Sequence, residues 1–323
     1  MQATRRMRAA AALFLAAYAV SLFLAAHAVA DNGPHVMGAG AMTDTCAACH
    51  RAHTAQAPYL LKEPETELCY TCHGASATGA STDVEDGVGY SSTQRTGKPG
   101  ALRGGGFKYA LIDSGHPSGN GYVGEVPVRT TGVPVTSAHS VDSSSQVAWG
   151  NGPIGAEANY GKTISLRCGS CHDPHGNGNY RILRPIPLES GATSGVTIPD
   201  APTKVYTTTN YWEVEDENAP GFIANISTWC ATCHTRYLAG AHSATTNSGD
   251  GVYAYRHRTN ETSQGSPTCI QCHVSHGSNA SMGTYSASVP NPNGTPDEGT
   301  AAGPDSRLLR IDNRGVCQMC HNK

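Results

Sequence analysis

Every cysteine of this 323-residue chain stands in one short motif, Cys-x-x-Cys-His. Two thiols three residues apart lie on one side of a helical turn, as attachment to the two vinyl groups of a haem requires. The imidazole that follows reaches one face of the iron, so the motif is the attachment signature of c-type haem. The twelve cysteines therefore predict six covalently attached haem c groups, each with a proximal histidine. The six units are Cys46-Cys49-His50, Cys69-Cys72-His73, Cys168-Cys171-His172, Cys230-Cys233-His234, Cys269-Cys272-His273 and Cys317-Cys320-His321.

Other uses of paired cysteines fit this pattern less well. A zinc ribbon combines two Cys-x-x-Cys pairs and needs no histidine after each of them. A thioredoxin-type pair occurs once, after a strand of a βαβ unit, and no such unit is indicated here. A disulfide scaffold would suit an exported chain, but it gives no reason for six histidines in register. The haem interpretation alone uses every residue of the motif.

The N-terminus has the pattern of an export signal. Three arginines within the first eight residues precede an uncharged stretch that ends in Ala28-Val29-Ala30, a small-x-small cleavage sequence. We expect residues 1–30 to be a cleaved signal peptide. The alternative is a retained anchor, because the uncharged stretch is long enough to cross a bilayer. No later segment is long and apolar enough, so we expect no membrane span in the mature chain, residues 31–323.

Ordinary core material is scarce in this sequence. It has 4 Phe and 3 Trp against 37 Gly and 19 Pro, whereas a chain of this size normally buries many large apolar side chains. We therefore expect stacked haems to form the core of a single domain over residues 31–323. Their covalent attachment would stabilise the chain much as disulfides stabilise domains with a small core. The expected fold class is a multihaem cytochrome c, mostly irregular coil with short α-helices at the haem motifs and few short strands. Without haem the chain should be largely unfolded.

Loops rich in Gly, Ser, Thr, Asn and Pro separate the motifs, a composition that usually indicates disorder. In a haem protein we expect such loops to wrap the cofactors, with helices only around the motifs. The expected helices are residues 45–55, 66–73, 228–239 and 313–321, and the expected strands are residues 121–128 and 204–211.

Spare histidines outnumber the irons. Of 15 histidines, one lies in the signal segment and six are proximal, which leaves eight for six distal positions. Three follow a proximal histidine by three residues, and helical spacing would put both imidazoles on one side of a turn, so the second cannot reach the far face of its own haem. We expect these three to ligate other irons. The six predicted distal ligands are His53, His116, His175, His242, His257 and His276; His139 ranks beside His242, and His35 ranks last.

Methionine, the other common axial ligand, is rare in the mature chain, so low-potential haems with two histidine ligands are favoured. With every iron six-coordinate there is no open site for chemistry, which predicts an electron-transfer protein rather than an enzyme. A multihaem reductase would need one open haem face, and all six motifs end in histidine. The acidic balance, 25 Asp and Glu against 22 Lys and Arg with no basic stripe, argues against nucleic acid as a partner.

The motif order resembles the hexahaem outer-surface cytochromes of metal-reducing bacteria, the OmcS-type family that polymerises into extracellular nanowires. The resemblance covers the order of the motifs along the mature chain and does not extend to the loops. The matching segments are Cys46-Ala-Ala-Cys49-His50-Arg-Ala-His53 with the nearby Cys69 unit, Cys168-Gly-Ser-Cys171-His172-Asp-Pro-His175-Gly, Trp229-Cys230-Ala-Thr-Cys233-His234, Cys269-Ile-Gln-Cys272-His273-Val-Ser-His276 and Cys317-Gln-Met-Cys320-His321-Asn-Lys.

In that family the second histidine of the first motif crosses the subunit interface and ligates the fifth haem of the neighbour. Carried over, the resemblance implies that His53 completes the haem of His273 in the next copy. Such a head-to-tail contact does not close and generates a fibre. It also implies an extracellular or cell-surface location and, as partners, other cytochromes or terminal electron acceptors. The alternative expectation is a monomeric shuttle, periplasmic or attached to a membrane complex.

Overall fold

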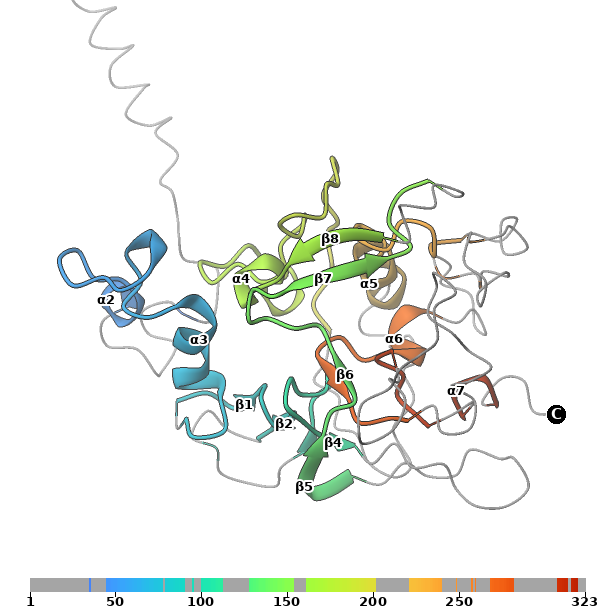
Figure 1. The fold of residues 1–323 in the computed structure, drawn as a ribbon, viewed down its shortest axis with the longest axis horizontal. Helices are drawn as coiled ribbons and strands as arrows, with labels where there is room; N and C mark the ends of the chain where they lie inside the picture. Colours follow the sequence, from blue (N-terminus) through green and yellow to red (C-terminus); the bar gives the residue numbers. More distant parts are fainter. Residues whose placement is uncertain are drawn as a thin grey trace, which may run out of the picture.

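The computed structural model describes residues 35, 45–77, 79–90, 95, 100–112, 128–153, 161–201, 221–239, 248, 257, 259, 268–281, 307–312 and 315–318. Within these, most of the backbone is irregular, and the helices and strands are short (Figure 1). The predicted mixture of coil, short helices and few short strands is confirmed. The signal segment, both predicted strands except residue 128, His116, His242 and the last haem-motif histidine lie outside the described residues.

The helices sit at the haem motifs. Each begins at or before the first cysteine or ends at the second, because the two thiols need one helical turn between them. They are α2 (Thr45–Cys49), α3 (Glu65–His73), α4 (Cys168–Cys171), α5 (Phe222–Cys230), α6 (Cys269–Cys272) and α7 (Gly315–Gln318), with two 3₁₀ turns, η1 (Pro58–Leu60) and η2 (Tyr180–Ile182).

The strands form four small antiparallel sheets, which hold loops beside the motifs. Sheet one is β1 (Thr82–Asp83), β2 (Val88–Gly89) and β3 (Gly100–Ala101); the others pair β4 (Tyr109–Ile112) with β5 (Val128–Pro134), β6 (Ser137–Ala138) with β9 (Gly277–Ser278), and β7 (Ser145–Trp149) with β8 (Gly161–Ser165).

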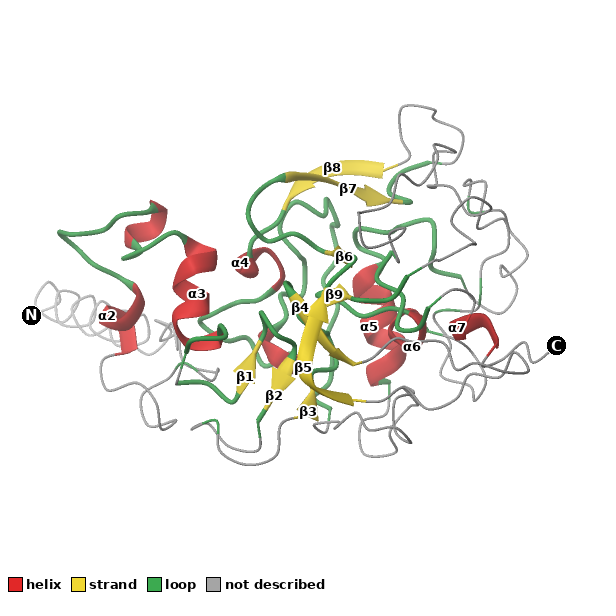
Figure 2. Ribbon diagram, turned by 60° about the horizontal axis from the view of Figure 1, so that its bottom comes forward, coloured by secondary structure: helices red, strands yellow, loops and turns green. Residues whose placement is uncertain are grey.

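The six motif helices follow one another in sequence order along the horizontal axis of the molecule, from α2 at one end to α7 at the other (Figures 1 and 2). Two neighbouring pairs pack directly, α3 against α4 and α5 against α6. The attachment sites are therefore arranged as a row, with α2 and α7 at its two ends. A row places each haem site next to the one before it and the one after it.

Among the residues that the structure describes, apolar packing is divided among three small clusters rather than gathered in one core. One lies under β2 and β4, one around α5, and one between β7 and β8, where Ala148 and Ile164 face inward. The α5 cluster is the largest because Phe222, Ile223 and Ile226 lie on one face of that helix, as the i, i+1, i+4 pattern dictates. The scarcity of large apolar side chains thus limits each cluster to a few residues.

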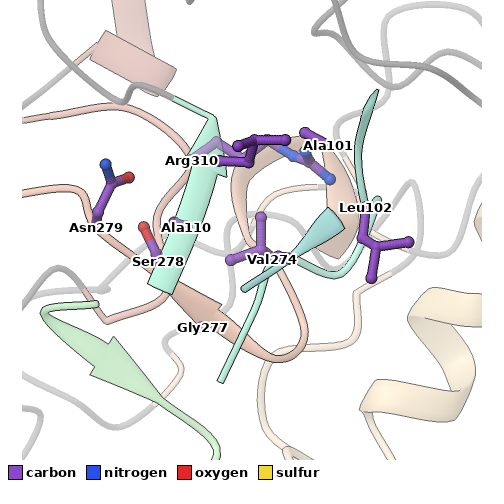
Figure 3. A pocket seen from close by; sticks show the side chains of 11 residues that line it. Ala101, Leu102, Ala110, Val274, Gly277, Ser278, Asn279 and Arg310 are labelled. Carbon is purple, nitrogen blue, oxygen red and sulfur yellow. The ribbon is translucent and has the colours of Figure 1, made fainter. Parts of the chain in front are cut away.

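A shallow pocket opens beside β4 and β9 (Figure 3). Its lining is mostly small and apolar, with Arg310 as the one cation among the lining residues and no motif cysteine or histidine. Gly277 belongs to its wall, where a Cβ would stand 2.3 Å from the carbonyl oxygen of Gly106, so only glycine permits this close backbone approach. Within the described part of the chain, no helix is long and apolar enough to cross a membrane.

Two expectations about helices are wrong. The helix predicted over residues 228–239 begins earlier, at Phe222, and ends at Cys230, because its buried face is the apolar run before the motif and turns follow it. The helix predicted over residues 45–55 ends at Cys49. The proximal histidines that follow α4 and α6, His172 and His273, have extended backbone, with φ of −107° and −114°. The His-x-x-His segments are therefore not helical, and the two imidazoles of each do not share a turn.

Candidate haem-binding sites

Three of the motifs share a second segment that the sequence reading missed. In each, a pair of residues with left-handed backbone is followed by leucine and a basic residue. Non-glycine residues avoid positive φ, so three such pairs indicate a conformation imposed by the surroundings. The segments are Tyr59-Leu60-Leu61-Lys62, Arg181-Ile182-Leu183-Arg184 and Arg307-Leu308-Leu309-Arg310.

Backbone hydrogen bonds tie each segment to its motif in the same way. The residue after the proximal histidine donates to the second left-handed residue: Arg51 to Leu60 (2.7 Å), Asp173 to Ile182 (2.8 Å) and Val274 to Leu308 (2.8 Å). The basic residue then donates to the second cysteine, with Lys62, Arg184 and Arg310 bonded to Cys49, Cys171 and Cys272 at 3.0, 2.8 and 2.9 Å. These two hydrogen bonds fix the backbone on both sides of the proximal histidine.

The left-handed loops present a carbonyl to the proximal imidazole. Nδ1 of His50 lies 2.9 Å from the Tyr59 oxygen, Nδ1 of His172 lies 2.9 Å from the Arg181 oxygen, and Nδ1 of His273 lies 3.0 Å from the Arg307 oxygen. In the fourth motif, β7 supplies the acceptor, since Nδ1 of His234 lies 2.6 Å from the Trp149 oxygen. In the second motif it is a hydroxyl, Thr82 Oγ1, 2.8 Å from Nδ1 of His73. Anchoring Nδ1 fixes the ring and directs Nε2 outward as the ligand atom.

Four proximal imidazoles face a second imidazole from elsewhere in the chain. Two imidazoles on opposite faces of one iron have ring centres roughly 6 Å apart, because each metal–nitrogen bond is about 2 Å. The observed centre-to-centre separations are 6.0 Å for His35 and His73, 6.2 Å for His50 and His175, 6.2 Å for His139 and His234, and 6.5 Å for His172 and His276. The residues present therefore fit a haem iron between each pair.

Two of the second members of the pairs, His35 and His139, are also anchored through Nδ1 to a motif backbone. His35 reaches the Pro174 oxygen at 3.0 Å and His139 reaches the Ser275 oxygen at 2.7 Å. Both oxygens belong to the residue two positions after a proximal histidine, in the third and fifth motifs. The pairing of β6 with β9 places His139 beside the fifth motif. The His139 backbone N–H also donates to the carbonyl of His276 at 2.9 Å. The Tyr237 ring also lies 6.1 Å from His234, but it is packed beside that ring from the same loop.

Three of the paired imidazoles, those of His73, His234 and His276, are neutral near pH 7. Burial, with the neighbouring His35 as the next cause, lowers the pKa of His73 to about 4. Burial and His139 lower the pKa of His234 to about 4, and burial and His172 lower the pKa of His276 to about 3. Neutral imidazole is the form that binds a metal. Proton competition therefore does not oppose iron binding at these three positions.

Comparison with known proteins bears on the first two motifs. Residues 39–78 match the family model described as Doubled CXXCH motif. This chain is a multihaem c-type cytochrome. No curated protein and no solved structure matches its sequence. Haem c is thus carried covalently on the motif cysteines, and cytochromes of this class are extracytoplasmic in general.

Neighbouring attachment sites of the cytochrome lie close together at their cysteines. The side chain of Cys69 in the second motif lies beside that of Cys168 in the third, and the side chain of Cys230 in the fourth lies beside that of Cys269 in the fifth. A further hydrogen bond, 3.2 Å long, joins the Cys269 backbone N–H to Ser227 of α5. Among the described residues, no cluster of three or more His, Cys, Asp and Glu side chains is arranged around a common point. The thiols are thus placed in pairs between consecutive sites.

Of the predicted distal ligands, the structure places two opposite a proximal histidine of the cytochrome, His175 and His276. It also pairs His35 and His139, which the sequence ranking had put behind others. His53 and His257 are exposed, and His116 and His242 lie outside the described residues. Pairs such as His35 with His73 could not be ranked from the sequence because they depend on non-local contacts. A signal for His139 existed, since Ala-His-Ser occurs at both residues 138–140 and 241–243.

Proposed function

We propose that the cytochrome carries electrons along a row of six haems, each iron held between two histidines. The observation that supports this most directly is the set of four imidazole pairs, all 6.0–6.5 Å apart between ring centres. The order of the motif helices along one axis supports a row in which consecutive haems would lie side by side (Figure 1). A continuous series of close cofactors, without a substrate site, is what electron transfer needs.

The pairs follow what we call the rule of two: the second histidine of a Cys-x-x-Cys-His-x-x-His motif faces the proximal histidine of the motif two places earlier in the chain. The second histidine of the third motif, His175, faces the proximal histidine of the first motif, His50. The second histidine of the fifth motif, His276, likewise faces His172 of the third. The second and fourth motifs, which have no second histidine, receive His35 and His139 from segments earlier in the chain. The Cys-x-x-Cys-His-x-x-His segments of the third and fifth motifs would therefore each join two haems of the row and make it more rigid.

A reductase with one open haem is the competing function from another class. It would require an iron whose distal face has no protein ligand, and four of the proximal histidines already face a second imidazole. This supports an electron-transfer protein over an enzyme. The spin state of the remaining two irons would distinguish an electron-transfer protein from a reductase.

Haem load is the first prediction. The mature protein should have an intact mass equal to residues 31–323 plus six haems, with no thiol that reacts with alkylating reagents. The reason is that all twelve cysteines lie in complete motifs. A mass with fewer haems and reactive cysteines would contradict the count of six. A mass that retains residues 1–30 would instead favour the anchor.

His175→Ala tests the ligand pairing. Removing this imidazole should convert one ferric haem in six from low-spin to high-spin, because His50 would then ligate the iron alone. Electron paramagnetic resonance of loaded protein measures the change, and carbon monoxide should bind to that one reduced haem. An unchanged low-spin spectrum in His175→Ala would contradict the assignment.

We propose further that the cytochrome polymerises head to tail through His53. In the rule of two, the second histidine of the first motif has no earlier motif to serve, and it is exposed. In the fifth motif, His273 belongs to none of the four imidazole pairs of the described residues. Applied across two copies, the same rule places His53 of one copy opposite His273 of the next, as the nanowire resemblance also implies.

The surface around His53 supports this contact. Leu60, in the left-handed loop of the first motif, is 54% exposed, and Tyr59 is 75% exposed. The residues equivalent to Leu60, which are Ile182 and Leu308, are partly buried by their surroundings. Ala52 occupies the position whose carbonyl binds a histidine in the third and fifth motifs. A second copy would cover these groups, whereas a monomeric shuttle would leave them in water.

A further inference from the structure

The four imidazole pairs differ in the angle between their ring planes. The planes of His50 and His175, at the first site, are only 10° apart and so nearly parallel. The other three pairs are crossed, with interplanar angles of 75° (His35 and His73), 65° (His172 and His276) and 49° (His139 and His234). A histidine ring turns easily about its Cβ–Cγ bond. The surroundings of each ring therefore decide its plane.

At the third site, a phenyl ring fixes the plane of the distal imidazole. The centre of the Phe107 ring lies 4.4 Å from that of His276, and the two rings are 23° from parallel. Stacked aromatic rings attract each other at this separation. Rotation of the imidazole out of the stack would drive its edge into the face of the phenyl ring. Residues 31–323 contain only two phenylalanines, and one of them is placed here.

The loop at residues 104–107 holds this stack in place. The His276 backbone N–H donates to the Gly104 carbonyl at 2.7 Å, and Nδ1 of His276 lies 3.3 Å from the Gly105 oxygen. A Cβ on Gly104 would stand 3.1 Å from the same Nδ1, so glycine leaves room for the ring. At the other end of the loop, the Phe107 backbone N–H donates to the Val84 carbonyl at 2.8 Å. One loop thus anchors both the backbone and the ring of the distal histidine.

The proximal ring of the third site is held independently. Nδ1 of His172 lies 2.9 Å from the Arg181 oxygen in a left-handed loop. The angle of 65° is therefore fixed from both sides, by two loops that are far apart in the sequence. At the first site, by contrast, the side chain of His175 is 65% exposed. The crossed arrangement at the third site is built by packing around both rings.

The angle between two axial imidazoles changes the electronic state of the iron that they bind. Each ring interacts through its π orbital with an iron d orbital. Parallel rings raise the energy of the same d orbital, whereas crossed rings divide the effect between two orbitals. The electron vacancy of ferric iron lies in the highest of these orbitals, so parallel rings stabilise the ferric state more. Crossed rings therefore give a more positive reduction potential, and they move the ferric resonance to a large g value at low field.

We propose that Phe107 is a positioning residue that keeps the imidazole planes of the third haem crossed and thereby raises its reduction potential. This inference rests on the proposed ligation of haem iron by His172 and His276. It gives the loop at residues 104–107 a role in electron transfer beyond covering the cofactor. The third site is interior to the row, so its potential affects every electron that passes along the row.

Substitutions of Phe107 in fully loaded protein test this role. Phe107→Ala removes the stacked ring and Phe107→Leu replaces it with an apolar side chain that is not flat. In both, the resonance of the third haem should broaden and move from the large-g form toward the rhombic form of nearly parallel rings. One haem's share of the spectroelectrochemical titration should move to a more negative potential. Phe107→Tyr keeps the aromatic face and should reproduce the wild-type resonance and titration.

His276→Ala identifies the resonance of the third haem, because it should convert that one large-g low-spin component to high-spin. The haem count by mass is measured on every sample. If His276→Ala loses this component but Phe107→Ala and Phe107→Leu retain it unchanged, the inference is wrong and the proposed ligation stands. If His276→Ala keeps every low-spin component, the ligation itself fails.

If Phe107→Ala does not load its third haem, the shift in Phe107→Leu decides. A shift in Phe107→Tyr as large as in Phe107→Leu would overturn the inference, because it would show that the contact is not one of ring stacking. Wild-type protein in which the component lost in His276→Ala is already rhombic would overturn it as well.

Discussion

His53→Ala is expected to abolish filaments and to leave one haem in six high-spin in each subunit. The reason is that His53 is exposed and has no earlier motif to serve, while His273 belongs to none of the four imidazole pairs of the described residues. A metal–imidazole bond across every interface would be lost at once, so assembly should fall below detection rather than weaken slightly. Electron microscopy and paramagnetic resonance of the same preparation measure the two effects.

The matched control is His175→Ala, which removes the corresponding histidine of the third motif. Its partner His50 lies in the same chain, so this variant should also have one high-spin haem but should still form filaments. Filaments that persist in His53→Ala would show that another contact holds the copies together. A wild-type protein that is monomeric with six low-spin haems would refute polymerisation and leave the electron-transfer proposal intact.

The attachment sites and the general character of the fold could be predicted because they depend on local sequence. Two cysteines and a histidine at fixed spacing require one helical turn, and the described helices occur at those places. The helix boundaries were less predictable. Each motif helix in the third and fifth units ends before its histidine, since the imidazole must turn away from the helix to bring Nδ1 to a carbonyl in a distant loop.

The left-handed loops could have been found as a repeat but were missed. Tyr59-Leu60-Leu61-Lys62 and Arg181-Ile182-Leu183-Arg184 begin nine residues after their proximal histidines, which is a detectable spacing. The third copy begins 34 residues after His273, so the insertion conceals it. Nothing in the residue types signals positive φ, because tyrosine, arginine, leucine and isoleucine all avoid it. The conformation follows from the need to present the carbonyl.

The opposing imidazoles depend on tertiary contacts that no spacing reveals. His139 reaches His234 only because β6 pairs with β9, two strands that are far apart in the sequence and only two residues long. His35 reaches His73 through a hydrogen bond to Pro174 in the third motif. Sequence reasoning counted enough histidines for every iron, but their assignment required the structure.

Haem attachment itself is expected to decide whether the chain folds. The three apolar clusters contain five, seven and three buried residues, and each lies in a different part of the molecule. The free energy of unfolding of a folded protein is only about 5–15 kcal/mol, and it normally depends on one continuous apolar core. Protein produced without haem attachment should therefore have no cooperative thermal transition and a radius close to that of an unfolded chain, as measured by circular dichroism and X-ray scattering.

The loss of thermal stability on removing one haem should depend on the position of that haem in the row. Cys46→Ser with Cys49→Ser removes the site at the end of the row and should lower the melting temperature least (Figure 1). Cys168→Ser with Cys171→Ser removes the third site, whose Cys168 lies beside Cys69 and whose second histidine faces His50. This change should also destabilise the first and second sites and lower the melting temperature several times more. Equal losses from the two pairs would mean that the haems stabilise the chain independently, and a cooperative haem-free protein would mean that the apolar clusters suffice.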